Sequence, residues 1–166
     1  MHKEHAYIGL GSNLDEPVAQ IEVALGKLDH ISDSRVLSRS SLYASKPMGP
    51  QDQPDFINAV CLLETALSPL ELLHSLQAIE LEQGRERKGE RWGARTLDLD
   101  ILLYGSLTMN TKELTVPHYG MAEREFVMVP LFEIAPSMVM PDGKPIAQWV
   151  ANCSLEGLRR LRSPSN

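Results

Sequence analysis

Cysteine and long apolar runs are both scarce in this sequence. Its 166 residues include two cysteines, Cys61 and Cys153, which lie far apart and form no CxxC pair. This argues against a disulfide framework or a zinc site and is typical of a reducing compartment. No segment has the pattern of a signal peptide, and no run reaches membrane-spanning length. We therefore expect a soluble cytoplasmic protein with no membrane partner, and Cys61, in the apolar run AVCLL, as a buried thiol.

Positive charge is also in short supply. The formal net charge is −6 and the isoelectric point about 5.3. Nucleic acids and anionic membranes are generally bound by basic faces, so neither is expected as a partner, although a small local anion site is compatible with this charge. The content of 43% hydrophobic and 23% charged residues, without repeats, is that of a globular protein. The length favours one domain over residues 1–166, and a monomer is the default expectation.

The glycine-rich phosphate loops of common nucleotide-binding folds are missing. The pattern GxxxxGK followed by Ser or Thr does not occur, and GLGSNL (9–14) lacks the third glycine of the dinucleotide fingerprint. A bound nucleoside triphosphate would therefore have to be held by side chains and metal ions.

The apolar patterns predict an α+β fold. Strands are expected at 6–12, 35–44, 56–67 and 96–104, and helices over 17–28 and from the capping sequence SPLE (68–71) to a glycine cap at Gly84. This βαββαβ order is that of the ferredoxin-like fold. We expect an antiparallel sheet with its helices packed on one face, the other face free for a site, and a C-terminal extension that begins with a loop and a short helix. Two long loops, 45–55 and 85–95, are the places where function is expected.

Two aspartates interrupt the apolar strand at 96–104. If the strand begins near Thr96, Asp98 and Asp100 project from one face, with Cα atoms roughly 7 Å apart, and the other face carries Leu97, Leu99, Ile101 and Leu103. Such a carboxylate pair stays ionised when a cation holds it, and Mg²⁺ commonly binds to one or two carboxylates together with substrate phosphates. The pair could also bind two ions roughly 4 Å apart. The alternative is an edge strand with a solvated acidic face.

The residues before this strand favour the metal site. Five of the chain's 16 basic residues lie between positions 85 and 95: Arg85, Arg87, Lys88, Arg91 and Arg95. A charge run is usually only a solvated loop. Here it leads into paired carboxylates, and Mg²⁺ ligands beside arginines are what a nucleoside triphosphate requires. On the preceding helix, Gln77 and Glu80 share a face that points toward this segment, although exposed helix surface is the alternative.

The strand that follows loop 45–55 also carries an alternating pair, Phe56 and Asn58. An aromatic ring beside an amide suits a flat heterocycle, because the ring can stack and the amide can pair with the heterocycle's edge. A core position for Phe56 is the alternative. After the aspartate strand, His118, Tyr119 and Arg124 form a further polar group, which is weak evidence for a site on its own.

These motifs together resemble a known enzyme family. RWGARTLDLDILLYG (91–105) is similar to the signature of 6-hydroxymethyl-7,8-dihydropterin pyrophosphokinases, which commonly reads RWGPRTLDLDI. The resemblance continues through GSNL, PMGPQDQPDFIN, GRERKGERWG and TVPHYGM followed by REFVMVPL. It implies a ferredoxin-like fold and the transfer of pyrophosphate from ATP to the hydroxymethyl group of the pterin, with release of AMP, in folate biosynthesis.

The matching positions imply a role for each site residue. Asp98 and Asp100 would ligate two Mg²⁺ ions and, with Arg85 and Arg95, form the catalytic set; Arg85 and Lys88 would lie on a mobile catalytic loop expected to close over the site. The implied ATP site comprises Gln77, Glu80, Arg87, Lys88, Trp92, Arg95, Ile101, His118, Tyr119 and Arg124. The implied pterin site comprises Ser45, Met48, Phe56, Asn58, Trp92 and Phe126, with Phe56 and Phe126 stacking on the two pterin faces.

Four positions depart from the family's common residues. Ala94 and Lys46 stand where proline is common, Phe56 where tyrosine is common, and Ser45 where threonine is common. None is a metal or phosphate position, so they bear on substrate affinity only. The residues leave the general base open between Asp98 and a metal-bound water.

Two other functions are compatible with a βαββαβ order. One is an RNA-binding module, which would need two or three stacking aromatics on its central strands, where FINAVCLL offers one. The other is a regulatory ligand-binding domain, which would not need paired aspartates.

Overall fold

The computed structural model describes residues 3–13, 16–45, 55–83, 97–118, 125–140, 143–152 and 158–162. Its elements, in chain order, are β1 (Glu4–Ser12), α1 (Pro17–Leu28), β2 (Ser34–Arg39), β3 (Leu42–Ser45), β4 (Phe56–Thr65), α2 (Pro69–Glu82), β5 (Asp98–Tyr104), β6 (Met109–Asn110), β7 (Thr115–Val116), α3 (Glu125–Ile134), α4 (Ile146–Asn152) and β8 (Leu158–Arg162). None of the helices in these ranges is long and apolar enough to cross a membrane.

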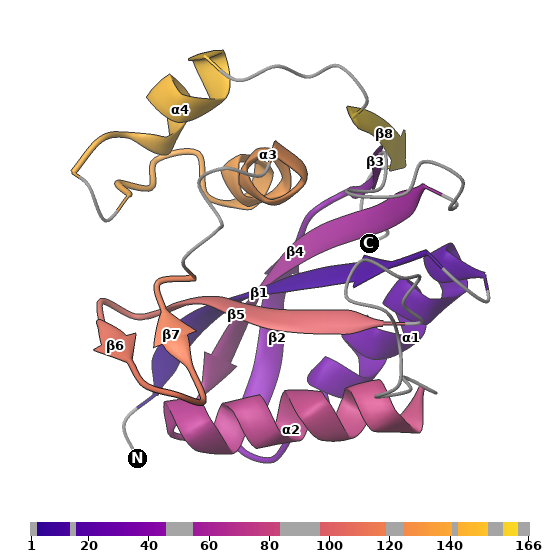
Figure 1. Ribbon diagram of the computed structural model, residues 1–166, viewed down its shortest axis with the longest axis vertical. Helices are drawn as coiled ribbons and strands as arrows, with labels where there is room; N and C mark the ends of the chain where they lie inside the picture. Colours follow the sequence, from indigo (N-terminus) through magenta and orange to yellow (C-terminus); the bar gives the residue numbers. More distant parts are fainter. Residues whose placement is uncertain are drawn as a thin grey trace.

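The main sheet has the ferredoxin-like topology that the sequence predicts. Its strand order is β5-β1-β4-β3-β8, with β2 also paired to β4, and all of these pairings are antiparallel. β2 and β3 lie end to end along the same edge of β4, so together they take the place of the second strand of the βαββαβ unit (Figure 1). β8, from the C-terminal extension, adds a further strand beside β3.

The strand expected at 35–44 is divided into β2 and β3 by two buried serines. Ser40 N donates to Val60 O at 2.8 Å, and Val60 N donates to Ser40 Oγ at 2.9 Å, so a side-chain hydroxyl replaces a backbone acceptor in the ladder. The register with β4 also shifts between Val36 and Ser38. Residue alternation cannot reveal this, because serine is compatible with either face of a strand.

α1 and α2 pack on one face of the sheet, as expected (Figure 1). The buried residues recur at the three- and four-residue spacing of an amphipathic helix: Ile21, Ala24, Leu25 and Leu28 from α1, and Leu72, Leu76 and Ile79 from α2. The capping box of α2 is present, with Glu71 N donating to Ser68 Oγ and Ser68 N donating to Glu71 Oε1. The helix ends at Glu82; Gly84, the expected cap, lies outside the described residues. Cys61 is fully buried, which raises the pKa of its thiol to about 12, and Cys153 is not described.

The opposite face of the sheet is free only in part. α3 lies over it and α4 packs beside α3 (Figure 1), and a second apolar cluster joins Val60 and Leu102 of the sheet to Val127, Met128 and Leu131 of α3. This helix belongs to the segment for which the sequence predicted only a loop and a short helix. One face is thus covered by α1 and α2, and a site on the other face must share it with α3.

A β-bulge in β5 changes the predicted orientation of its second half. Ile8 pairs with Ile101 and Tyr7 with Leu103, so Leu102 is the extra residue. Leu103 consequently contacts the α3 cluster and Tyr104 joins the α1/α2 core. The expectation that Leu103 shares a face with Leu97 and Leu99 is therefore wrong, because alternation holds only while the register is continuous.

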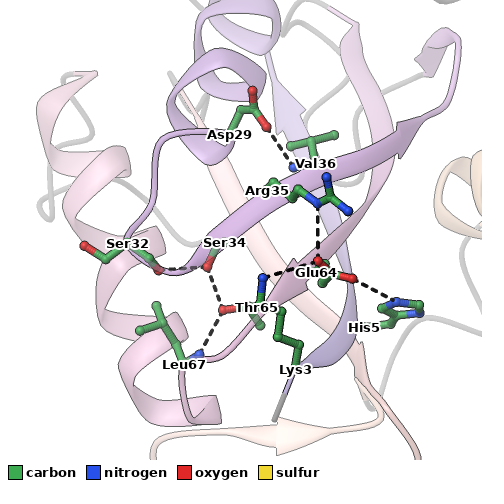
Figure 2. Close-up of polar contacts among 10 residues, drawn as sticks. All are labelled: Lys3, His5, Asp29, Ser32, Ser34, Arg35, Val36, Glu64, Thr65 and Leu67. Carbon is green, nitrogen blue, oxygen red and sulfur yellow. Dashed lines mark hydrogen bonds and ion pairs between the residues drawn. The ribbon is translucent and has the colours of Figure 1, made fainter. Parts of the chain in front are cut away.

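The polar contacts at the C-terminal end of β4 lie mostly at the protein surface. Figure 2 shows Glu64 accepting a hydrogen bond from Arg35 at 3.2 Å, with His5 and Lys3 at 3.8 and 3.7 Å. Its neighbour Thr65 shares a hydrogen bond with Ser34 at 2.6 Å. Exposed ion pairs of this kind contribute about 0–1 kcal/mol each. These polar contacts lie at the end of the sheet opposite the end that carries Phe56 and Asn58.

Candidate active site

The sheet register brings the two predicted site patterns into one row. Asp98 pairs with Gly11, Gly11 with Asn58, and Asn58 with Tyr43, so the row crosses β5, β1, β4 and β3. The row faces α3, because Val60, two residues from Asn58 on β4, belongs to the α3 cluster. The aspartates and the Phe56/Asn58 pair, about 40 residues apart in sequence, therefore meet on one face.

Asp98 and Asp100 project from the α3 face of β5, as predicted. Leu99, between them, is 4% exposed and lies in the α1/α2 core, whereas Asp98 is half-buried and Asp100 exposed. Their partners on β1 are Gly11 and Gly9, which have no side chains to crowd the carboxylates. Two carboxylates beside glycine backbone provide the oxygen ligands that Mg²⁺ binds in proteins.

Gly11 forms the floor between the aspartates and Asn58. A Cβ atom at this position would lie 3.1 Å from Asn58 Oδ1 and 3.9 Å from Phe56 Cδ1. Positive φ angles among the described glycines occur at Gly105 and Gly143, so the backbone at Gly11 does not itself require glycine. The close approach of the Asn58 amide is the reason that a side chain at this position would be crowded.

Asn58 is held by the neighbouring strand. Its Nδ2 donates to Ser45 Oγ at 2.8 Å, and the two side chains are 5% and 3% exposed. Phe56, which pairs with Ser45 in the register, is half-buried at the edge of the same face. An amide group has two donors and a carbonyl acceptor. With Ser45 using one donor, the amide of Asn58 is oriented but retains hydrogen-bonding capacity for a ligand.

Glu80 contacts the aspartate strand directly. The carboxylate is 5% exposed, and its Oε2 accepts a hydrogen bond from Leu99 N at 2.8 Å. Leu99 is the residue between the two aspartates, so α2 is tied to the middle of the DLD pattern. Gln77, which shares its helix face, is exposed. The sequence placed both residues near the site but gave no indication that Glu80 is buried against the backbone of β5.

The remaining described site residues come from three segments. His118 follows β7 and lies beside β5, because its backbone N donates to Leu102 O at 2.9 Å. Phe126, in the first turn of α3, is half-buried and packs against the α3 cluster. Ile101 is 2% exposed, and its side chain lies in the α1/α2 core on the other side of the sheet from Asp98 and Asp100. Of these, Phe126 lies in the helix that packs on the aspartate face, and His118 lies in the segment that is hydrogen-bonded to β5.

Eight predicted site residues lie outside the described residues, and their roles stay predictions: Met48, Arg85, Arg87, Lys88, Trp92, Arg95, Tyr119 and Arg124. Within the part of the chain that is described, no group of three or more His, Cys, Asp or Glu side chains could hold a metal ion. A metal at Asp98 and Asp100 would therefore need further oxygen ligands from substrate or water, which is the usual arrangement for Mg²⁺.

The sequence did not indicate the role of Glu133, near the C-terminal end of α3. Its carboxylate accepts hydrogen bonds from Ser41 N at 2.9 Å, Ser41 Oγ at 2.7 Å and Tyr43 Oη at 2.8 Å. Burial and this contact raise the pKa of Tyr43, although Arg160 of β8, its register partner, acts in the opposite direction. A glutamate within the apolar helix EFVMVPLFEI was the available signal, because a charge on a packed face needs partners.

Comparisons with known proteins identify the family to which this chain is similar. Residues 7–136 match the model of the family described as 7,8-dihydro-6-hydroxymethylpterin-pyrophosphokinase (HPPK). A 2-amino-4-hydroxy-6-hydroxymethyldihydropteridine pyrophosphokinase of Haemophilus influenzae is 57% identical over 145 residues, which cover 87% of this chain and 90% of the relative. The protein of the same name from Pseudomonas aeruginosa is 50% identical over 158 residues, covering 95% of this chain and 97% of the relative.

The fold is also found in solved structures. The crystal structure of Plasmodium falciparum HPPK-DHPS with pteroate superimposes with a TM-score of 0.75 over 96% of this chain, at 14% identity. This chain spans 44% of that structure, and at this identity the likeness supports the fold alone.

Proposed function

Because the chain belongs to the 7,8-dihydro-6-hydroxymethylpterin-pyrophosphokinase family, we propose that it transfers pyrophosphate from ATP to the hydroxymethyl group of 6-hydroxymethyl-7,8-dihydropterin in folate biosynthesis. The predicted pyrophosphokinase is confirmed at the level of the family. Neither an RNA-binding module nor a regulatory domain is favoured. The single observation that carries the proposal is the row in which Asp98 and Asn58 face the same side of the sheet across Gly11.

The aspartate end of the row is the proposed nucleotide and metal end. Asp98 and Asp100 would hold two Mg²⁺ ions, which neutralise phosphate charge when bound. Glu80 accepts a hydrogen bond from the backbone N–H of Leu99, the residue between the two aspartates, and so holds this part of β5 in place. His118 lies beside β5 near this end. We propose that Glu80, His118 and Gln77 line the ATP site, together with Arg87, Lys88 and Arg95, whose positive charges suit the triphosphate.

The amide end of the row is the proposed pterin end. Asn58, oriented by Ser45, would pair with the polar edge of the heterocycle, and Phe56 and Phe126 would pack on its two faces. The hydroxymethyl group would then point along the row toward Asp98. Pre-arranged side chains of this kind lower the barrier by placing the two substrates next to each other.

Two bonds at the β-phosphorus change in the reaction, and the hydroxymethyl group loses its proton. The hydroxymethyl oxygen forms a bond to the β-phosphorus of ATP, and the bond from that phosphorus to the bridging α–β oxygen breaks in line, so AMP leaves with the electron pair. The hydroxyl proton is lost to Asp98 or to water. The protein contributes mainly positioning and charge neutralisation, as in phosphoryl transfer generally.

The test is the release of AMP from ATP, Mg²⁺ and the pterin by purified protein. Asp98→Asn and Asp100→Asn should each lose most turnover while the melting temperature stays level or rises, because a repulsion in the ligand-free protein is relieved. Asp33→Asn is the matched control, because Asp33 lies in the turn before β2 and its φ of 57° is a conformation that asparagine adopts readily. This variant should keep full activity. Near-normal turnover in both site variants would refute the metal assignment. A single domain over 1–166, a monomeric state and a cytoplasmic location stay predictions.

A further inference from the structure

One carboxylate joins α3 to the sheet. Glu133 accepts three hydrogen bonds from β3 and the residue before it: from Ser41 N at 2.9 Å, Ser41 Oγ at 2.7 Å and Tyr43 Oη at 2.8 Å. Val127, Met128 and Leu131 of α3 contact the sheet through apolar side chains. Apolar contacts have no preferred direction, whereas hydrogen bonds have strict geometry. The three bonds to Glu133 therefore set how far along the sheet α3 lies.

Regular helix geometry places Phe126 and Glu133 on the same face of α3. They are seven residues apart, with Pro130 between them, and at 3.6 residues per turn this spacing corresponds to a rotation of about 20° around the helix and a rise of about 10 Å along it. Fixing Glu133 on β3 consequently fixes the position at which the other end of the helix presents Phe126.

The strand that binds Glu133 also carries the pterin end of the proposed site. Ser41, Tyr43 and Ser45 alternate along this strand edge, so their side chains share a face. Tyr43 pairs with Asn58 in the register, and Ser45 accepts the hydrogen bond from Asn58. Glu133 thus contacts the same strand face that orients the Asn58 amide.

We infer that Glu133 is a positioning residue for the pterin pocket, because its carboxylate fixes the ring of Phe126 relative to Phe56 and Asn58. The inference rests on the proposed function, since it takes Phe126 and Asn58 to be pterin contacts. Glu133 is not among the residues proposed to contact either substrate. Its loss should therefore weaken pterin binding and leave ATP binding as it is.

The test measures the dissociation constants of pterin and of a non-hydrolysable ATP analogue separately, by calorimetry, together with the melting temperature. Tyr43→Phe removes one of the three hydrogen bonds and should weaken pterin binding about fivefold. Glu133→Gln turns an acceptor into a donor opposite Ser41 or Tyr43 and should have a larger effect. The ATP analogue should bind to both variants within about twofold of its normal affinity.

Tyr104→Phe is the matched control for loss of a tyrosine hydroxyl. Tyr104 Oη donates to Leu67 O, between β5 and the start of α2, on the face of the sheet away from α3. This variant should lower the melting temperature and leave pterin affinity unchanged. If Glu133→Gln does not fold, Tyr43→Phe still decides the question.

Phe126→Ala separates the inference from the proposed function. If this variant keeps normal pterin affinity, the proposed pterin pocket is misplaced, and the inference fails with it. If Phe126→Ala weakens pterin binding but Tyr43→Phe and Glu133→Gln do not, the pocket stands and the positioning role of Glu133 is refuted. Equal losses for pterin and the ATP analogue would also refute it, because they would indicate a general disturbance of the fold.

Discussion

Replacing Gly11 by alanine tests the proposed site, because Gly11 lies between Asp98 and Asn58 in the row of paired residues across the sheet. The new Cβ would lie 3.1 Å from Asn58 Oδ1, closer than the 3.4–4 Å of ordinary van der Waals contacts, so the amide would have to move by a few tenths of an ångström. Asn58 has little room to do so, since it is 5% exposed and its Nδ2 is bonded to Ser45 Oγ. We expect the side chain to leave its preferred rotamer.

The expected effect on stability is small because two contributions oppose each other. A side chain displaced by about 30° from its rotamer costs about 0.5–1.5 kcal/mol. Alanine in place of glycine restricts the unfolded chain and returns about 0.4–1 kcal/mol where the backbone conformation permits it. The free energy of unfolding of Gly11→Ala should therefore lie within about 1 kcal/mol of the original value.

The expected effect on pterin binding is much larger. A displaced amide cannot align with the edge of the heterocycle, which should cost about 1–3 kcal/mol, equivalent to a dissociation constant about 5- to 140-fold higher. Calorimetric titration with pterin, alongside thermal unfolding, measures both quantities on one sample.

Gly9→Ala is the matched control, two residues earlier on the same strand face. Its Cβ would lie 3.4 Å from Leu102 Cδ2, an ordinary contact with a flexible side chain. This variant should keep its pterin affinity and be as stable as the original protein or slightly more so. Normal pterin binding by Gly11→Ala, or an equal loss in both variants, would refute the proposed position of the pterin beside Gly11.

Two further predictions concern residues on either side of this row. Asn58→Ala should weaken pterin binding by about 1–3 kcal/mol and leave ATP affinity unchanged in calorimetry, and equal losses for the two ligands would mean that the pocket lies elsewhere. Glu80→Ala leaves the buried Leu99 N–H without its acceptor, which should cost about 1–3 kcal/mol of folding free energy. We expect this variant to have a melting temperature several degrees lower and to need a higher Mg²⁺ concentration for half-maximal AMP release. Glu80→Gln retains an acceptor oxygen and should recover most of both quantities, whereas an unchanged melting temperature in Glu80→Ala would contradict the role assigned to the hydrogen bond.

Local patterns in the sequence predicted the elements that local physics determines. α1 spans the expected residues, and α2 begins at the predicted capping box, because amphipathic spacing and cap chemistry depend on neighbours within one turn. The alternation in β5 correctly placed Asp98 and Asp100 opposite the core. The prediction failed at Leu103, where a bulge imposed by pairing with β1 interrupts the alternation.

Two of the contacts that sequence reasoning missed have the same physical form. Glu80 reaches from α2 to Leu99 N of β5, and Glu133 reaches from α3 to Ser41 N before β3. In each case a helical carboxylate satisfies a backbone N–H of a strand that is distant in sequence, a pairing that no periodicity encodes. Each contact lies next to a part of the proposed site: the aspartate pair for Glu80, and Tyr43 with the Asn58 row for Glu133. A carboxylate partly or largely withdrawn from water is retained only where it has donors, so glutamates within apolar helix stripes are the sequence signal for such contacts.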